Sequence, residues 1–123
     1  MRRAARLVIS LALVLAAAAP AAARGLASFG RCLEREGAVF YGTSWCPQCD
    51  AQRRVLGSAM SYVPYVECSV DGERRSNTEC KDADIHAYPT WEFGDGSRAT
   101  GRQSLEALAS RTGCALDDEP DDD

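Results

Sequence analysis

The starting point is the segment AVFYGTSWCPQC, which occupies residues 38–49 of the 123-residue chain. Ala38 to Tyr41 is short, apolar and aromatic, and a glycine follows it, which predicts a buried strand. Pro47 suits the first position of a helix, where its missing N–H costs nothing. The segment therefore predicts a strand, a tight polar turn, and a helix whose first turn carries Cys46 and Cys49.

Hydrophobic periodicity predicts further helices and strands on both sides of this segment. Apolar residues at helical spacing predict a helix from Leu26 to Glu36, stopped by Gly37, and a second strand is predicted from Val63 to Cys68. The two strands around the Cys46 helix form a β-α-β unit, so they should be parallel with a right-handed crossover. The other predicted elements are a short helix over 79–85, a strand over 90–93, a turn over 94–97, an edge strand over 98–100, and a last helix from Ser104 to Gly113.

The helix that follows Cys46 is predicted to be one continuous amphipathic element. Asp50 and Arg54 are four residues apart and should pair on its outer face. Gly57 lies inside it and should cost about 1 kcal/mol relative to alanine. Its apolar face consists of Val55, Leu56, Ala59, Met60 and Val63.

The two ends of the chain differ in composition from the middle. Three arginines, an apolar run over 7–19 and an Ala-Ala-Ala site predict a secretory signal peptide over 1–23. An uncleaved membrane anchor is the alternative, because residues 7–23 reach the lower length limit of a spanning helix. Six of the last seven residues, 117–123, are acidic, which predicts a disordered tail after a folded domain over 24–116.

The charge and cysteine content restrict the class of protein. The net charge is −4, and outside the tail acids and bases nearly balance without a basic face, which argues against nucleic-acid binding. An even number of cysteines in a small exported domain predicts disulfides. The residues alone leave the pairing open among Cys32, Cys46, Cys49, Cys68, Cys80 and Cys114.

Two motifs resemble those of the thioredoxin-like superfamily: WCPQC at 45–49 after the first core strand, and YPT at 88–90 before the third. Within that superfamily the chain looks most like the domain fused to bacterial and plant homologues of vitamin K epoxide reductase. The resemblance runs from about Phe29 to Gly113 and implies an α/β fold with a central four-stranded mixed sheet flanked by helices. It rests on Tyr41-Gly42, YVPYVEC at 62–68, Glu79-Cys80, YPTW at 88–91 and SLEAL at 104–108.

The Cys-x-x-Cys spacing suits thiol–disulfide exchange, in which one thiolate attacks and a second thiol resolves the mixed disulfide. Cys46 at the helix N-terminus meets the positive end of the dipole, which favours its thiolate, so we assign it as nucleophile and Cys49 as resolving thiol. Half of a zinc site is the alternative, but Cys68 and Cys80 lie 12 residues apart without a zinc-knuckle pattern. We therefore expect neither a metal nor a cofactor.

The resemblance also implies a substrate-contacting surface around the sulfurs. The matching proline in the superfamily is cis and faces the Cys-x-x-Cys, so Pro89 is expected to be cis. Trp45, Pro47 and Tyr88 are expected to contact substrate beside it, although buried aromatic side chains are the alternative. His86, the only histidine, is expected to be a surface residue near this loop rather than a catalytic base.

The four remaining cysteines are assigned to two disulfides. In the resembled family the residues matching Cys68 and Cys80 form a second disulfide, sometimes implicated in electron relay, and here we favour a structural bridge. Cys32 and Cys114 are then paired by elimination, which would tie the first and last helices together.

The functional hypothesis is an exported thiol–disulfide oxidoreductase, monomeric, acting on protein thiols and disulfides in a periplasm, a lumen or the exterior. Thioredoxins carry a buried acid six residues before the first cysteine, where this chain has Phe40, which favours an oxidant or isomerase over a reductase. No multi-helix membrane domain is visible, so a quinone reductase of the vitamin K epoxide reductase type would be a separate chain or would be missing. The alternatives are a disulfide-stabilised binding module without catalysis, and metal delivery through Cys46 and Cys49.

Overall fold

The computed structural model describes Ala12 and residues 26–116. Apart from Ala12, the signal peptide predicted over 1–23 and the acidic tail predicted over 117–123 lie outside the described residues. Within the described part, no helix is both long enough and apolar enough to cross a bilayer.

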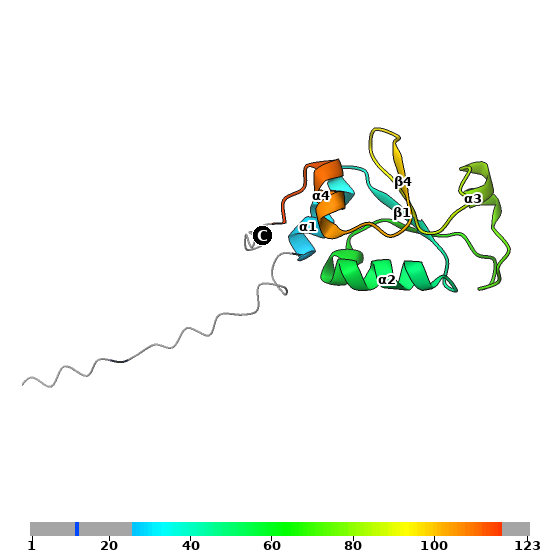
Figure 1. The fold of residues 1–123 in the computed structure, drawn as a ribbon, viewed down its shortest axis with the longest axis horizontal. Helices are drawn as coiled ribbons and strands as arrows, with labels where there is room; N and C mark the ends of the chain where they lie inside the picture. The colour runs from blue at the N-terminus through cyan, green and yellow to red at the C-terminus, as the bar shows by residue number, and fades with distance from the viewer. Residues whose placement is uncertain (1–11, 13–25, 117–123) are drawn as a thin grey trace, which may run out of the picture.

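The elements between residues 26 and 112 follow the predicted order of helices and strands (Figure 1). They are α1 (Leu26–Arg35), β1 (Val39–Gly42), α2 (Pro47–Leu56), the 3₁₀ helix η2 (Gly57–Ser61), β2 (Tyr65–Glu67), α3 (Thr78–Asp82), β3 (Thr90–Glu92), β4 (Arg98–Thr100) and α4 (Leu105–Thr112). The caps predicted for the last helix are confirmed: the Ser104 hydroxyl accepts the Ala107 N–H, and Gly113 is left-handed with φ 77°. Most predicted boundaries are displaced by only a few residues.

The four strands form one mixed sheet in the spatial order β2-β1-β3-β4. Strand β1 is parallel to β2, with Phe40 opposite Tyr65, and antiparallel to β3, with Phe40 opposite Trp91. Strands β3 and β4 form the predicted antiparallel hairpin. The parallel β-α-β unit and the four-stranded mixed sheet flanked by helices are therefore confirmed, and the fold is thioredoxin-like.

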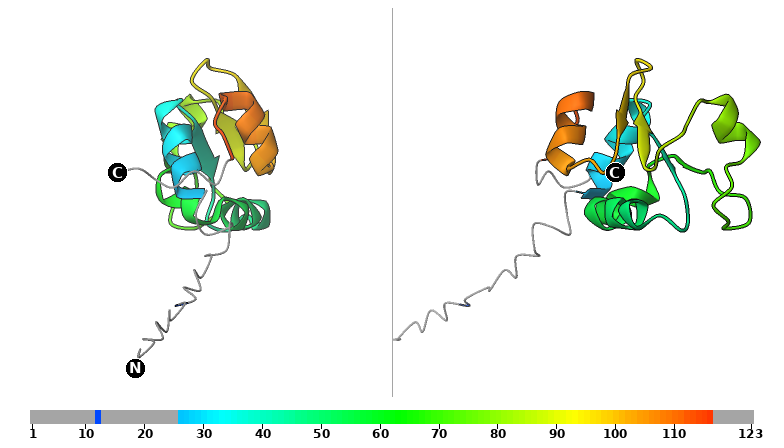
Figure 2. Two further views of the ribbon diagram at one scale, coloured as in Figure 1. Left: turned by 90° about the vertical axis from the view of Figure 1, so that its left-hand side faces the viewer. Right: turned by 45° about the vertical axis from the view of Figure 1, so that its right-hand side comes forward.

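Consecutive residues of β1 face opposite sides of the sheet, so the molecule has two apolar clusters. Phe40 lies in the larger one, with buried residues of α1, α2, η2 and α4. Tyr41 packs on the smaller one, formed by Cys68, Cys80 and Ile85. Figure 1 shows α3 at the opposite end of the molecule from α1 and α4, and the right-hand view of Figure 2 shows the strands between α3 and α4.

Helix α1 packs closely against η2. A Cβ atom at Gly30 would lie 2.5 Å from the carbonyl oxygen of Ala59, well inside van der Waals contact. Glycine at this position therefore permits the close approach that buries Phe29 and Leu33 of α1 in the larger cluster.

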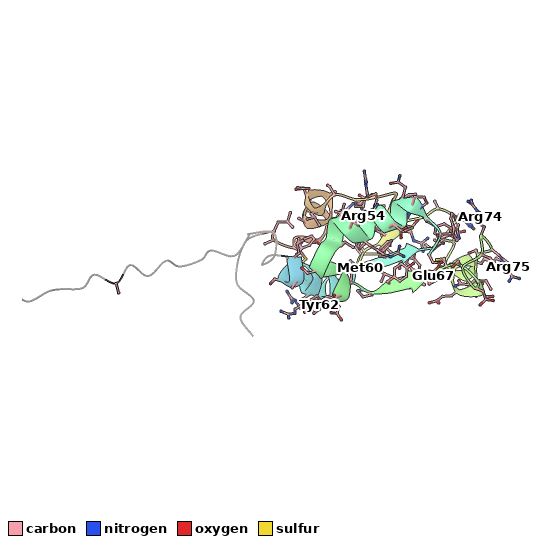
Figure 3. The ribbon with its side chains drawn as sticks, turned by 90° about the horizontal axis from the view of Figure 1, so that it is seen from below. Arg54, Met60, Tyr62, Glu67, Arg74 and Arg75 are labelled. Atoms are coloured by element: carbon pink, nitrogen blue, oxygen red, sulfur yellow. A yellow bond between two sulfur atoms is a disulfide. The ribbon has the colours of Figure 1, made fainter. Side chains whose placement is uncertain are left out.

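Two predictions for the helix after Cys46 are wrong. The α-helix ends at Leu56, because Gly57 adopts φ 53° and ψ −126°, a conformation that is costly for residues with a Cβ, and a 3₁₀ turn follows. Asp50 pairs with Arg53 at 2.7 Å rather than with Arg54. Arg53 lies between α2 and β2, where it also donates to the Tyr65 hydroxyl at 2.7 Å, whereas Arg54 is exposed and points away (Figure 3).

Candidate active site

The two motif sulfurs lie at the junction between β1 and α2. Cys46 is the N-cap residue of α2, with extended backbone angles, and Pro47 opens the helix and is exposed. The Cys46 sulfur accepts a hydrogen bond from the Cys49 N–H at 3.3 Å. N-cap side chains satisfy free N–H groups of the first turn, and here a sulfur atom fills that role. The helix N-terminus therefore presents its dipole and an N–H donor to Cys46.

The two cysteines differ in exposure. Cys46 exposes 5% of its surface and Cys49 none, and both are free thiols. Burial, reinforced by the hydrogen bond with Cys46, raises the pKa of the Cys49 thiol from 9.0 to about 12. Cys49 therefore stays protonated at neutral pH, and Cys46 is the sulfur that an external thiol or disulfide can reach.

The loop before β3 faces Cys46. The Tyr88–Pro89 peptide bond is cis, and Pro89 is buried. The carbonyl oxygen of Tyr88 accepts the Cys46 thiol hydrogen over 3.7 Å, across a sequence separation of 42 residues. The fold thus brings Tyr88 and Pro89 together with the sulfurs.

A groove of about 770 Å³ opens beside Cys46. The Trp45 and Tyr88 rings meet edge to face with centroids 6.0 Å apart, and the Arg74 guanidinium lies 4.8 Å from the centre of the Trp45 ring. The aromatic pair therefore forms one wall of the groove. The residues that line it are Trp45, Cys46, Arg74, Ser76, Lys81, Ile85, His86, Ala87 and Tyr88.

Glu67 at the end of β2 forms hydrogen bonds with the loop that precedes Cys46. Its carboxylate accepts the Ser44 N–H at 2.9 Å, the Ser69 N–H at 3.2 Å, and the hydroxyls of Ser69 and Tyr65. Burial raises the pKa of the Glu67 carboxyl, but these hydrogen bonds outweigh it and hold the pKa below its ordinary value. Glu67 is therefore ionised at neutral pH and holds Ser44, two residues before Cys46. The sequence did not indicate this role, although Glu67 lies within the YVPYVEC string.

Phe40, at the position where thioredoxins carry a buried acid, lies close to Cys49. The Phe40 ring stacks on Trp91 at 5.2 Å and meets Tyr65 edge-on at 5.1 Å. A Cβ atom at Gly42 would lie 3.1 Å from both the Phe40 ring and the Cys49 sulfur, so ring and sulfur are neighbours across Gly42.

Gln52 is a fully buried polar residue one turn after Cys49 that the sequence analysis also missed. Its side-chain oxygen accepts the Trp91 indole N–H at 3.0 Å and the Gln103 N–H at 2.7 Å, and its amide donates to the Gln103 carbonyl at 3.0 Å. These bonds tie α2 to β3 and to the loop before α4. Its partners are 39 and 51 residues away, so no local pattern could have indicated its burial.

The other four cysteines form two disulfides. Cys32–Cys114 joins α1 to the segment after α4, with Cα atoms 5.8 Å apart. Cys68–Cys80 joins the residue after β2 to α3, with Cα atoms 5.5 Å apart, and both of its cysteines are fully buried. The pairing agrees with the one expected from the sequence and leaves Cys46 and Cys49 as the free thiols.

His86 is exposed at the groove, and its Nε2 lies 2.5 Å from a carboxylate oxygen of Asp84.

Within the residues that the structure describes, no group of three or more His, Cys, Asp or Glu side chains is arranged to hold a metal ion. A Cys46 that borders the groove and a Cys49 that is fully buried suit the attacking and resolving roles of thiol–disulfide exchange.

No protein-family model matches the chain. Over 85 residues, 66% of this chain, it is 38% identical to the thiol–disulfide oxidoreductase LTO1 of Arabidopsis thaliana. The chain spans only 22% of the length of that protein.

Solved thioredoxin structures are also similar to this one. Mitochondrial thioredoxin 3 of Saccharomyces cerevisiae, in its oxidised form, is 25% identical, with a TM-score of 0.44 over 62% of this chain and 74% of that chain. Thioredoxin O2 of Arabidopsis thaliana is 18% identical, with a TM-score of 0.43 over 76% of this chain and 91% of that chain. The thioredoxin-like fold is given by the strand order of the protein's own sheet, and the sequence is similar to part of a thiol–disulfide oxidoreductase.

Proposed function

We propose that the protein is a thiol–disulfide oxidoreductase that exchanges disulfides with protein substrates through Cys46 and Cys49. The observation that carries this proposal is the asymmetry of the two sulfurs. Cys46 caps α2 and borders the groove, whereas Cys49 is fully buried and its pKa is raised to about 12. The similarity to part of LTO1 supports the same chemistry.

The exchange proceeds in two displacements at sulfur. In the oxidised protein, a substrate thiolate attacks the Cys46 sulfur of a Cys46–Cys49 disulfide, and Cys49 leaves with the electron pair and takes up a proton. The second substrate thiolate then attacks the substrate sulfur of the mixed disulfide, and Cys46 leaves as a thiolate. Two electrons pass from the substrate to the pair, and the reverse sequence reduces a substrate disulfide.

We propose that the protein works as a donor or isomerase of disulfides rather than as a reductase. The N-cap position and the Cys49 N–H interact favourably with negative charge on Cys46, and Arg74 and Lys81 line the same groove. Charge stabilisation of this kind favours the reduced pair, and a stable reduced form makes a disulfide a stronger oxidant.

The test is oxidative refolding of a reduced client protein, together with insulin reduction as the reverse assay. Wild-type protein should accelerate at least one of the two reactions, and Cys46→Ser should abolish the acceleration. In the insulin assay, Cys46 of the Cys49→Ser protein should attack an insulin disulfide, release the second insulin sulfur as a thiolate and accumulate a mixed disulfide visible on a non-reducing gel. Wild-type rates equal to those of Cys46→Ser in both assays would contradict the proposal and favour a binding module without catalysis.

We further propose that the protein is exported and that its reduced pair passes electrons to a separate membrane quinone reductase. Two disulfides outside the motif support export, because oxidising compartments preserve such bonds. Mass spectrometry of protein recovered from its host should find Arg24 as the first residue, and a retained Met1 would contradict cleavage. In host membranes, the Cys49→Ser protein should form a mixed disulfide with a membrane protein, and Cys46→Ser should not.

A further inference from the structure

The groove beside Cys46 is cationic although the domain around it is not. Residues 26–116 carry twelve Asp and Glu against ten Arg and Lys. The residues that line the groove include Arg74, Lys81 and His86 but no Asp or Glu. Arg74 precedes α3, Lys81 lies within it and His86 follows it, so the fold gathers these side chains at one surface.

The positive charges of Arg74 and Lys81 are not neutralised by carboxylates of the described residues. The ion pairs found there involve Arg53, Arg75, His86 and Arg98. Arg74 instead covers the Trp45 ring, whereas its neighbour Arg75 pairs with Glu73 at 3.6 Å. Figure 3 shows both arginines at the end of the molecule away from Tyr62. His86 is held by Asp84, so Arg74 and Lys81 are the unpaired cations of the groove.

We propose that this groove selects substrates whose reactive cysteine lies in an acidic segment of polypeptide, and that Arg74 and Lys81 determine the preference. The inference rests on the proposed function of Cys46. Carboxylates near the substrate cysteine would meet the two cations while its apolar neighbours contact the wall formed by Trp45 and Tyr88. Unpaired charges beside a reactive atom raise the encounter rate with oppositely charged partners.

The test compares three dithiol peptides that differ only in the residues flanking their cysteines: two Glu, two Gln or two Lys. Each reduced peptide is mixed with the oxidised protein, and the second-order rate constant of exchange is measured. Because acidic neighbours raise the pKa of the peptide's own thiols, every rate is divided by the rate of the same peptide with hydroxyethyl disulfide, which is uncharged. The normalised rates then report the effect of the protein on exchange, separated from the intrinsic reactivity of each peptide's thiols.

The normalised rate of the Glu peptide should exceed that of the Lys peptide by roughly tenfold, since each exposed charge pair contributes about two- to fivefold. The ratio should approach one in about 1 M salt, where the Debye length is about 3 Å. Arg74→Gln combined with Lys81→Gln should reduce it to less than about twofold, and Arg74→Glu combined with Lys81→Glu should reverse it. Arg75→Gln is the matched control, because Arg75 adjoins Arg74 but does not line the groove, and it should keep most of the preference.

A binding measurement with Cys46→Ser protein needs no chemistry and tests the same groove. The Glu peptide should bind more tightly than the Lys peptide, and the Arg74→Gln, Lys81→Gln changes should remove the difference. Equal normalised rates for all peptides, or a preference lost in the Arg75→Gln control alone, would overturn the inference while leaving exchange intact. Absence of exchange with every peptide would overturn the proposed function instead. In that case the binding measurement still tests the inference, and equal binding of the Glu and Lys peptides by the Cys46→Ser protein would overturn it as well.

Discussion

Cys46 and Cys49 occupy the same turn of α2 but differ in every property that matters for exchange. The Cys46 sulfur accepts an N–H and faces the Tyr88 carbonyl at the groove. Cys49 is fully buried beside Phe40, and its thiol holds its proton. Local environment alone therefore distinguishes the residue that we propose attacks from the residue that we propose resolves.

The raised pKa of Cys49 has a consequence for stability. Between pH 9 and about 12 the unfolded chain releases this proton while the folded protein keeps it, so stability present below pH 9 is lost as pH rises. We predict that protein in which only the Cys46–Cys49 pair is reduced loses roughly 1 kcal/mol by about pH 10 relative to Cys49→Ser. Urea unfolding of both proteins from neutral to alkaline pH would measure it, and parallel curves would contradict the assignment.

At the level of single residues, the sequence predicted the two reactive cysteines but not the residues that hold or surround them. Helical spacing after a buried strand was enough to place Cys46 at an N-terminus. Glu67 and Gln52 act through hydrogen bonds with residues distant in the chain, and Lys81 lines a groove built from several segments, none of which a local pattern encodes. The position of Arg74 over Trp45 depends likewise on the folded loop.

Among the elements, α2 shows most clearly how tertiary structure overrides intrinsic propensity. Helix preferences alone predict that alanine at Gly57 would stabilise a continuous helix by about 1 kcal/mol. In the structure Gly57 has φ 53° and ends the helix, and η2 then turns toward Gly30 of α1. The continuous apolar pattern concealed this break, since the 3₁₀ turn also buries Ala59.

We predict that Gly57→Ala destabilises the protein by about 1–2 kcal/mol, because a Cβ is strained at this positive φ. The added atom would also lie 3.3 Å from a methyl carbon of Leu26. Equilibrium urea unfolding measures the change, with Ser58→Ala as the neighbouring control, expected to lie within about 0.5 kcal/mol of wild type. A gain in stability for Gly57→Ala would contradict this prediction and show that the helix propensity of alanine outweighs the strain at positive φ.

The two disulfides act on the whole molecule to different extents. Cys32–Cys114 spans 82 residues and Cys68–Cys80 spans 12, so the first restricts the unfolded chain more. In the chain-entropy account they stabilise by about 4–5 and about 3 kcal/mol respectively. Denaturant unfolding of the two double-serine variants should therefore show the larger loss for Cys32→Ser with Cys114→Ser. A larger loss for the Cys68, Cys80 double variant would contradict this ranking.

The overall topology was accessible from the sequence because strand and helix periods alternate along the chain and the β-α-β rule restricts the pairing. The groove could not be predicted, because its walls come from segments around Trp45, Arg74 and His86 that are separated in the sequence and meet only in the folded molecule. The cationic character of the groove is likewise a property of the folded molecule.

The central claim, that Cys46 and Cys49 form an oxidising disulfide pair, is tested most directly by their reduction potential. The protein is equilibrated with glutathione buffers, and mass spectrometry reads the state of all six cysteines. The account predicts a potential of about −120 to −180 mV for this pair, in the range of known oxidants and isomerases, while the other two disulfides stay intact. A potential near about −270 mV, the value of a reducing thioredoxin, would contradict it.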